Sequence, residues 1–394
     1  MKDFENRFLS QMCIFHFCSA LDLAKGGRAN GLVSLVTQLS QFGIQNDIFS
    51  SGITREQIAR NSICFAELLN LGVNIRFSIS HVENEYGLGN FMDFRAGLKH
   101  DLVPDLIVLH QVYTLSTLIG FWYAKKINVP YVVFPHGSLT LYIESHSKLI
   151  KSIANRLVVS RILREANAVI VTCESEKKDL IKSLQSKAVL LTYGAEIKTN
   201  LPNSIESLSD KESIKRILFC GRFDKVKNIP LLLAAMPLII NRYPNTILDL
   251  AGSGSKKEFD ELKKITADLK IENNVVFHGW VNKIRLEELF KVTNLLVLPS
   301  KSENFALVVS EALSSGIPCV VSKFVGVSDI VARHKAGVII EELTVESVAA
   351  SVIKVLDGDH QAYRNAALRA VDEDLNWSKI ALKWKAMIRS LALD

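Results

Sequence analysis

Residues 295–322 read LLVLPSKSENFALVVSEALSSGIPCVVS, and this pattern predicts a strand, a helix and a second strand. LLVLPS, at 295–300, is apolar on both faces, which is typical of a buried strand. The apolar spacing of FALVVSEALSS, at 305–315, predicts a helix that Gly316 ends. PCVVS, at 318–322, is again strand-like. Strands joined by a helix in this order are typical of a parallel sheet.

The rest of the chain repeats this alternation of short apolar strands and helix-period segments. In the first half, strands are predicted at MCIFHFC, NDIFS, VNIRF, DLIVLH, YVVF, AVIVT and AVLLT. The polar stretch 198–215 has no apolar periodicity and is interpreted as a linker. Further strands are predicted at RILFC, TILDLA, NVVFHG, LLVLPS, PCVVS and GVII, and from about residue 344 the pattern is helical only. We therefore expect an α/β protein of two doubly wound domains, with a crevice between them as the ligand site.

Composition and cysteine usage are those of a globular protein in a reducing compartment. The chain has 394 residues, of which 48% are hydrophobic and 22% charged, and its net charge is +6. That charge is too small to indicate a nucleic-acid partner. The six cysteines are scattered and form no CxxC pair, which favours buried thiols over disulfides or a metal site.

The apolar stretches near the start do not predict a targeting or membrane segment. Residues 8–24 are interrupted by Gln11, His16 and Asp22, so a first strand at about 12–18 is preferred to a signal peptide. Residues 106–124 lack the roughly 20 clean apolar residues of a membrane span. We expect a cytoplasmic protein.

Two carboxylates, Glu303 and Glu311, flank the start of the predicted helix 305–315. An unpaired carboxylate is costly to bury, so their place in an apolar segment needs a reason. The N–H groups of Phe305, Ala306 and Leu307 are expected at the positive end of the helix dipole, where a phosphate is stabilised. Carboxylates on either side can accept hydrogen bonds from sugar hydroxyls, so the pattern indicates a nucleotide sugar. The alternative is that Glu303 caps the helix and Glu311 reaches solvent.

A second motif, FCGRFDKVKNIPLLLAAM at 219–236, places Gly221, Arg222 and Lys227 in a loop between a strand and a helix. Two cations there suit a diphosphate, because arginine grips phosphate bidentately and lysine adds a compact charge. The alternative is an ordinary solvated loop.

With these motifs in place, the chain resembles the retaining group-1 (family 4) glycosyltransferases of the GT-B fold. The resemblance is carried by the Gly-Arg-x4-Lys loop, VVFHGWV, PSxxE, the two glutamates separated by seven residues, and EALSSGIPCVVS. The first half contributes Gly26-Gly27 after the first strand and PHGS at 135–138. It covers nearly the whole chain and is more specific in the second half.

The resemblance implies an acceptor-side Rossmann-like domain at 1–200 and a nucleotide-sugar-binding Rossmann-like domain at 201–375. The C-terminal helices, with the last at 376–394, would return to the first domain. Implied catalytic roles fall on Arg222 and Lys227, which would neutralise the leaving diphosphate, and on Glu303, which would bind hydroxyls of the transferred sugar.

The remaining implied roles concern binding. Glu311 would bind the ribose hydroxyls, and the main chain near Val281 would contact the base. Gly27, having no Cβ, would let the first-domain backbone approach the phosphates. His136, to which the resemblance also gives a catalytic role, would lie across the cleft beside the donor sugar. Ala306 departs from the family pattern, because a glycine is usual there. FVGVSD at 324–329 departs as well, because it has one glycine and an aspartate where the family often has two glycines and a glutamate.

The implied reaction is glycosyl transfer from a nucleotide diphosphate sugar with retention at the anomeric carbon. No metal or cofactor is expected, because Arg222 and Lys227 would take the place of a cation. The expected acceptor is a glycan or lipid-linked glycan in cell-surface polysaccharide or lipopolysaccharide synthesis. A nucleotide-sugar 2-epimerase and a non-catalytic sugar-nucleotide binding protein stay as alternatives.

Three other patterns have structural interpretations. GSGS at 252–255 is predicted to be a strand-to-helix turn, and the Asp-x-Asp patterns at 357–359 and 372–374 to be solvated turns. The segment 147–165 has apolar residues at helical spacing and a basic face. It predicts either a core-packed helix or one that lies on an anionic membrane surface, which would make the protein peripheral.

Overall fold

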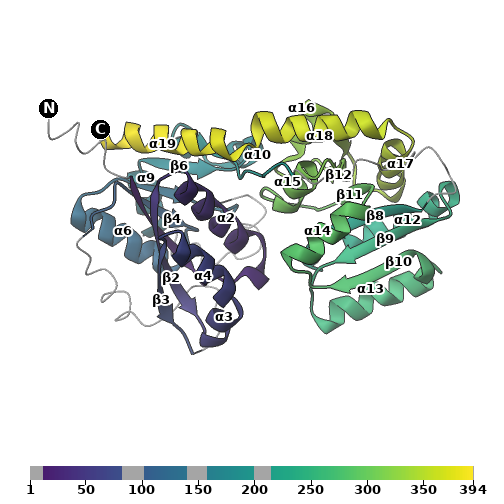
Figure 1. The fold of residues 1–394 in the computed structure, drawn as a ribbon, viewed down its shortest axis with the longest axis horizontal. Coiled ribbons are helices and arrows are strands. Elements are labelled where there is room, and N and C mark those ends of the chain that lie inside the picture. The colour runs from purple at the N-terminus through teal and green to yellow at the C-terminus, as the bar shows by residue number, and fades with distance from the viewer. Residues whose placement is uncertain (1–11, 82–101, 140–157, 199–213, 394) are drawn as a thin grey trace. The chain divides into compact units, whose positions relative to one another are not determined.

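The computed structural model describes residues 12–81, 102–139, 158–198 and 214–393. The chain divides into two compact units (Figure 1). The first comprises Met1–Tyr193 with Trp377–Asp394, and the second comprises Gly194–Asn376.

The first unit contains a parallel sheet in the strand order β3-β2-β1-β4-β5-β6-β7. Its strands are β1 (Cys13–Ser19), β2 (Gln45–Ile53), β3 (Asn74–Ile79), β4 (Leu106–His110), β5 (Tyr131–Phe134), β6 (Ala168–Val171) and β7 (Ala188–Leu190). All were predicted from their apolar runs. The strand order reverses between β1 and β4, which is where sheets of this kind bind ligands.

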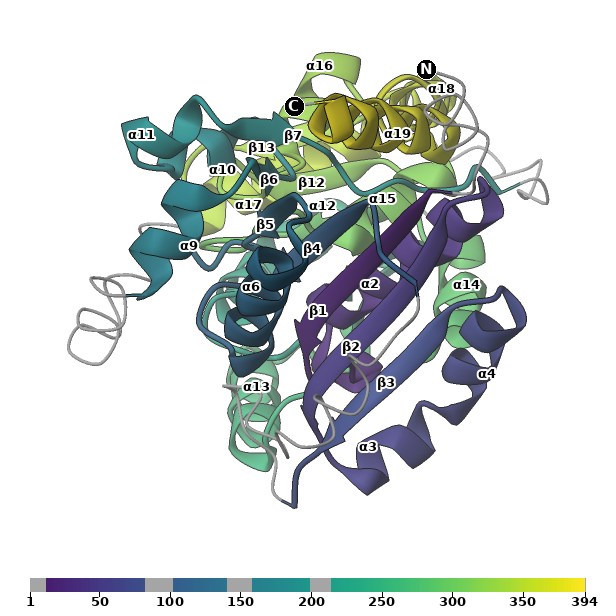
Figure 2. The same cartoon turned by 90° about the vertical axis from the view of Figure 1, so that its left-hand side faces the viewer.

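Helices cover both faces of this sheet (Figure 2). One face carries α2 (Gly27–Gln41), α3 (Arg55–Arg60) and α4 (Ser62–Asn70). The other carries α6 (Leu115–Ile127) and α9 (Ser160–Glu165). Two short helices, α10 (Glu174–Asp179) and α11 (Lys182–Gln185), follow β6.

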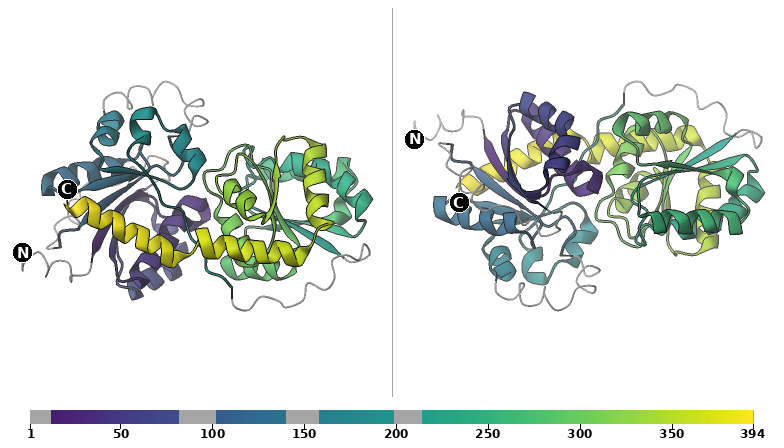
Figure 3. Two further views of the ribbon diagram at one scale, coloured as in Figure 1. Left: turned by 90° about the horizontal axis from the view of Figure 1, so that it is seen from above. Right: turned by 90° about the horizontal axis from the view of Figure 1, so that it is seen from below.

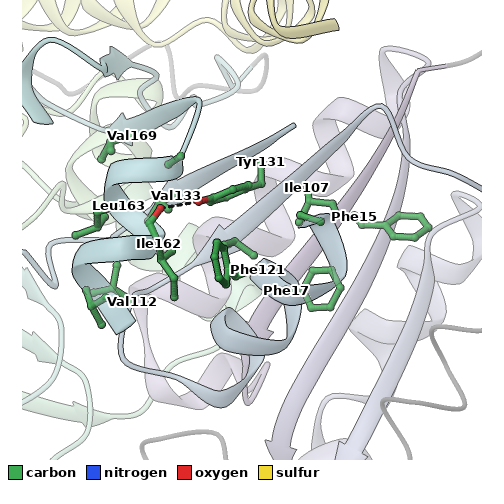
Figure 4. Close-up of a cluster of buried hydrophobic side chains, with 14 of the residues drawn as sticks. Phe15, Phe17, Ile107, Val112, Phe121, Tyr131, Val133, Ile162, Leu163 and Val169 are labelled. Atoms are coloured by element: carbon green, nitrogen blue, oxygen red, sulfur yellow. Dashed lines mark hydrogen bonds between the residues drawn. The ribbon is translucent and has the colours of Figure 1, made fainter. Parts of the chain in front are cut away.

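Alternation along β1 separates an apolar face from a face that holds a buried histidine. Phe15 and Phe17 pack into the core under α6, together with Phe121 of that helix (Figure 4). In the same cluster, the hydroxyl of Tyr131 donates to the carbonyl of Ile162 at 2.7 Å (Figure 4). Because side chains alternate along a strand, His16 lies on the opposite face, toward α2.

The second unit contains a parallel sheet in the order β10-β9-β8-β11-β12-β13. Its strands are β8 (Lys215–Cys220), β9 (Thr246–Ala251), β10 (Val275–Gly279), β11 (Leu295–Leu298), β12 (Cys319–Ser322) and β13 (Gly337–Ile340). Its helices are α12 (Ile229–Arg242), α13 (Lys256–Asp268), α14 (Lys283–Val292), α15 (Leu307–Ser314), α16 (Ser328–His334), α17 (Val345–Leu356) and α18 (His360–Asp374). The predicted strands and the helical tail are confirmed.

The last helix, α19 (Trp377–Leu393), belongs to the first unit and lies against α2 (Figure 3). Trp384 of α19 is buried, and the ammonium of Lys385 donates to the carbonyl of Phe42 at 2.7 Å. The chain passes from the first unit to the second just before Ala195 and returns just after Asn376. These two residues pair in an isolated bridge, so the two passages lie side by side.

Two predicted segments lie largely outside the described residues. Of the linker 198–215, only its ends are described, and Lys215 is fully buried in β8 rather than solvated. Of the basic segment 147–165, residues 158–165 are described. There Ile162 and Leu163 pack into the core, whereas Arg161 and Arg164 are exposed. Among the described residues, no helix has the length and apolar character needed to cross a membrane.

Candidate functional site

In the second unit, the predicted cation Lys227 and the predicted carboxylate Glu303 form an ion pair. Lys227 follows β8 and Glu303 follows β11, and these strands are neighbours in the sheet. Their carboxyl ends therefore bring the two loops together, and the ammonium of Lys227 donates directly to Oε2 of Glu303. The side chains are 13% and 21% exposed, so the pair is largely shielded from solvent.

Main-chain hydrogen bonds hold both members of this pair. The N–H of Glu303 donates to the carbonyl of Phe324 at 3.0 Å, and its own carbonyl accepts from Gly326 at 2.9 Å. The N–H of Lys227 donates to the carboxylate of Asp224 at 3.2 Å. The pair is thus preorganised by the backbone, not only by its own attraction.

Arg222 lies in the same loop but is much more accessible. Its side chain is 62% exposed, and its guanidinium lies 3.1 Å from Asp224 Oδ2. An ion pair this exposed is weak, so the guanidinium can turn to a bound anion at little cost. The loop itself is fixed by a close approach: a Cβ on Gly252 would lie 1.8 Å from the carbonyl oxygen of Gly221. The GSGS segment is therefore a tight turn before α13, as predicted.

The helix that was expected over 305–315 begins later than predicted. Leu307 is its first residue, and Ala306 caps it in the left-handed conformation, with φ of 72°. Phe305 lies before the helix and is buried. The expectation that all three N–H groups line the helix end is wrong for Phe305, because the chain turns at Ala306. Glu311 is then about one turn into the helix, or ~6 Å along its axis.

Glu311 lies near the same strand end as Lys227. Cys220 is the last residue of β8, and the pKa of its thiol responds to the charges of both side chains. Burial and then the charge of Glu311 raise its pKa to about 12, while Lys227 opposes the shift. Burial also raises the pKa of Glu311 to about 7, against the charges of Lys283 and Lys198. The residue nevertheless exposes over a third of its surface, so water offsets part of that shift.

Val281 lies in the loop between β10 and α14. In the sheet, β9 separates β10 from β8, the strand that precedes the Lys227 loop. The preceding Trp280 is 59% exposed, and Asn282 caps α14 by accepting from the N–H of Arg285 at 2.9 Å. Gly279, with φ of 68°, makes the turn at the end of β10. The loop therefore presents an aromatic ring, and contact of its main chain near Val281 with a base stays a prediction.

In the first unit, the adjacent positions Gly26 and Gly27 suit glycine for different physical reasons. Gly26 has φ of 95° and ψ of −153°, a conformation that essentially only glycine adopts. Gly27 begins α2, and a Cβ there would meet no protein atom within 4 Å. Protein packing does not require a glycine at Gly27, which fits the predicted close approach of a ligand.

A buried carboxylate that the sequence analysis missed anchors this glycine loop. Asp22 is fully buried and accepts from the guanidinium of Arg60 and from Asn61 Nδ2 at 3.0 Å. Burial works against ionisation, but these donors prevail and hold the pKa of Asp22 below its usual value. Asn61 also accepts from the N–H of Leu23 at 3.2 Å, so the clamp reaches the start of the loop.

His136 follows β5 in the left-handed conformation, with φ of 52°. Its Nε2 lies 2.8 Å from Nδ1 of His110, and its Nδ1 lies 2.9 Å from the hydroxyl of Tyr193. Burial, followed by the charge of Arg28, lowers its pKa to about 3, so the ring is neutral at physiological pH. His110 and Tyr193 were not predicted; the sequence signal was a polar residue at the end of an apolar strand.

The Asp-x-Asp pattern at 357–359 lies in the turn between α17 and α18, as predicted, whereas the prediction of a turn at 372–374 is wrong because these residues end α18. Asp359 caps α18 by accepting from the N–H of Ala362 at 3.0 Å, and Asp374 accepts from His334 at 2.6 Å. Within the described ranges, no three His, Cys, Asp or Glu side chains gather as metal ligands would.

Comparison with known proteins supports the same family across both units. Residues 202–370 match the model of the glycosyl transferases group 1, and residues 26–193 match that of a glycosyl transferase 4-like domain. An uncharacterized glycosyltransferase of Methanocaldococcus jannaschii is 32% identical over 228 residues, which are 57% of each chain. A D-inositol 3-phosphate glycosyltransferase of Corynebacterium urealyticum is 26% identical over 381 residues, covering 87% of this chain and 86% of the other.

Solved structures give the fold. Anabaena HepE in complex with UDP and glucose has a TM-score of 0.73 and 17% identity, covering 96% of this chain and 100% of the other. A glycosyltransferase from Rickettsia africae has a TM-score of 0.74 and 16% identity, covering 97% and 99%. Together with the two parallel sheets and the motifs on their strand ends, these matches show that the chain is a glycosyltransferase of group 1 with the GT-B fold.

Proposed function

We propose that the chain is a retaining glycosyltransferase that moves a sugar from a nucleotide diphosphate sugar to a glycan or lipid-linked glycan acceptor. The observation that supports this most is the Lys227–Glu303 pair at the carboxyl end of the second sheet, with Arg222 and Glu311 nearby. A site that combines two cations and two carboxylates fits a ligand with both phosphates and hydroxyls.

The proposed roles follow from charge and position. Negative charge develops on the diphosphate as it leaves the sugar, and Arg222 and Lys227 would stabilise it. Glu303 would accept from hydroxyls of the transferred sugar while it holds the Lys227 ammonium in place. Glu311 would accept from the ribose hydroxyls, and the loop at Val281 would contact the base. These two cations would replace a metal ion in the reaction.

The acceptor is proposed to be a glycan of cell-surface polysaccharide or lipopolysaccharide synthesis. One neighbour by fold, a lipopolysaccharide outer core galactosyltransferase, supports this acceptor class. We also propose that the protein attaches peripherally to a membrane through the segment 147–165, of which only residues 158–165 are described. Binding to anionic liposomes at low salt and release at high salt would support it. Absence of binding at low salt would leave a soluble acceptor.

The function is tested by incubating the protein with nucleotide diphosphate sugars and candidate acceptor glycans, and following the reaction by proton NMR. The proposal predicts release of nucleoside diphosphate together with a glycosidic product of unchanged anomeric configuration. An inverted product would contradict retention. Epimerisation of the donor sugar without any acceptor product would instead support the 2-epimerase alternative.

A further inference from the structure

An unbroken chain of hydrogen bonds crosses the first unit from β2 to Tyr193, three residues after the end of β7. Asn46 Oδ1 lies 3.0 Å from His16 Nε2, and His16 Nδ1 lies 3.0 Å from His110 Nε2. His110 Nδ1 lies 2.8 Å from His136 Nε2, and His136 Nδ1 lies 2.9 Å from the hydroxyl of Tyr193. All members except His136 are buried, and His136 is partly exposed at the end of the sheet.

The far end of this chain fixes the orientation of Asn46. Its Nδ2 lies 2.7 Å from the carbonyl of Ile44, which can only accept a hydrogen bond. The same Nδ2 also lies 3.0 Å from Ser40 Oγ. The NH2 group must therefore face Ile44, and the oxygen of the amide must face His16. That oxygen can only accept, so Nε2 of His16 carries the hydrogen atom.

The orientation passes from one ring to the next because a neutral imidazole donates through one nitrogen and accepts through the other. With hydrogen on Nε2 of His16, its Nδ1 accepts from Nε2 of His110. Nδ1 of His110 in turn accepts from Nε2 of His136. Nδ1 of His136 is left with a lone pair, which accepts from the hydroxyl of Tyr193. The pKa values of all three histidines are lowered, by burial first, which keeps the rings neutral.

We propose that Asn46, His16, His110 and Tyr193 are positioning residues that hold His136 in one tautomer and one ring orientation for the donor sugar. This inference rests on the proposed function, together with the place beside the donor sugar that the family resemblance implies for His136. Both ring nitrogens of His136 are engaged, so it serves as a fixed neutral group and not as an acid or base.

Packing adds to the constraint on the same ring. The ring of His136 stacks on Phe134 at a centroid distance of 4.0 Å. Tyr193 in turn fills the space beside Gly31 of α2, where a Cβ would lie 2.7 Å from its ring. The next residue is held as well, because the N–H of Gly137 donates to the buried carboxylate of Glu176 at 2.9 Å. The site of His136 is thus fixed from β5, α2 and α10.

The test has one arm that needs no activity. Nitrogen-15 NMR of histidine-labelled protein near pH 7 distinguishes the two neutral tautomers. The proposal predicts hydrogen on Nε2 in His16, His110 and His136. Hydrogen on Nδ1 of His136 would overturn it. Because this arm reads the ring and not the reaction, failure of the proposed function leaves it interpretable.

The second arm is a double-mutant cycle on transfer activity. Asn46→Ala is expected to lower kcat/KM about tenfold in the wild-type background and to have no further effect in a His136→Ala background. Asn74→Ala is the control, since Asn74 Nδ2 bonds Asp47 at 2.9 Å, outside the chain of histidines. It should leave kcat/KM unchanged. If Asn46→Ala fails to fold, Tyr193→Phe takes its place in the cycle. Equal losses in both backgrounds would overturn the proposal.

Discussion

The ammonium of Lys227 bonds to Oε2 of Glu303 across 76 positions of sequence, although each residue belongs to a different strand-end loop. Each side chain neutralises the charge of the other. Without its partner, that charge would be unpaired where it is largely shielded from solvent. In the proposed reaction both partners also contact the donor, so the pair links stability to catalysis.

Removal of one partner should cost stability, and removal of both should restore part of it. Lys227→Met leaves Glu303 without its cation, and we expect a loss of about 1–3 kcal/mol in the free energy of unfolding. The double variant with Glu303→Gln should regain about half of that loss and remain inactive. Urea denaturation and a transfer assay measure the two effects. Arg285→Met, which removes an exposed ion pair, is the control and should change stability by less than ~1 kcal/mol. A double variant less stable than Lys227→Met would contradict the account.

Arg222→Ala should lower kcat strongly and change the free energy of unfolding little. Its side chain is largely exposed, so little folding free energy depends on it. Loss of one preorganised group that stabilises developing negative charge typically lowers kcat by ~100-fold or more. Steady-state kinetics measure this, with a thermal melt as the check on folding. In the same assay, activity should survive a chelator, and a strict need for added divalent metal would refute the role given to the cation pair.

Ala306→Gly should stabilise the second unit. Ala306 has φ of 72°, and the left-handed conformation costs a residue with a Cβ about 1–2 kcal/mol. Glycine adopts it freely but loses ~0.5–1 kcal/mol through its more flexible unfolded chain. A net gain of up to about 1.5 kcal/mol is therefore expected in urea denaturation. Ala312→Gly, in the middle of α15 and buried, is the matched control and should destabilise. Destabilisation by both changes would show that Ala306 is not strained.

The sheets could be predicted from sequence because each strand is a short apolar run between turn signals, as in LLVLPS and YVVF. The pairing of Lys227 with Glu303 was within reach for the same reason, since both follow predicted strands. The start of α15 was misplaced by two residues because nothing in the local composition shows that an alanine adopts φ above zero. Backbone conformation there is set by the surrounding packing.

The bonds that position His136 and the glycine loop could not be predicted locally. The chain of histidines joins residues as far apart as Asn46 and Tyr193, and its geometry depends on which strands are neighbours in the folded sheet. The Asp22–Arg60 clamp joins a strand end to a helix in the same way. Sequence shows only that polar residues stand within or beside apolar strands.

The three linked histidines should make the protein less stable in mild acid. Their pKa values in the folded chain are lowered, to about 4 for His16 and about 3 for His136. Below the ordinary value of ~6.5, the unfolded chain binds protons that the folded chain does not. Stability is therefore full above pH 7 and falls as the pH drops from ~6.5 toward 4. Each buried histidine should cost about 1 kcal/mol between pH 7.5 and 5.5.

Urea denaturation at these two pH values measures the loss. His16→Gln removes one titrating group and should reduce the loss by about one histidine's share, roughly 1 kcal/mol. His334→Gln, which removes a partner of Asp374 in the second unit, is the comparison and should leave the loss caused by the three histidines intact. An identical pH dependence in wild type and His16→Gln would contradict neutral burial of the chain.

We expect the strand ends of the second unit to bind a nucleotide diphosphate, and calorimetric titration with UDP, GDP and other nucleoside diphosphates measures that binding. One of them should bind the wild type. Glu311→Ala should weaken that binding by at least tenfold, because hydrogen bonds to a charged group are worth ~1.5–3 kcal/mol each. Arg222→Ala should weaken it too, through loss of charge at the diphosphate. Glu346→Ala, a change in the first turn of α17, should have no effect. Absence of binding to any nucleoside diphosphate, or equal affinity in wild type and folded Glu311→Ala, would contradict the account.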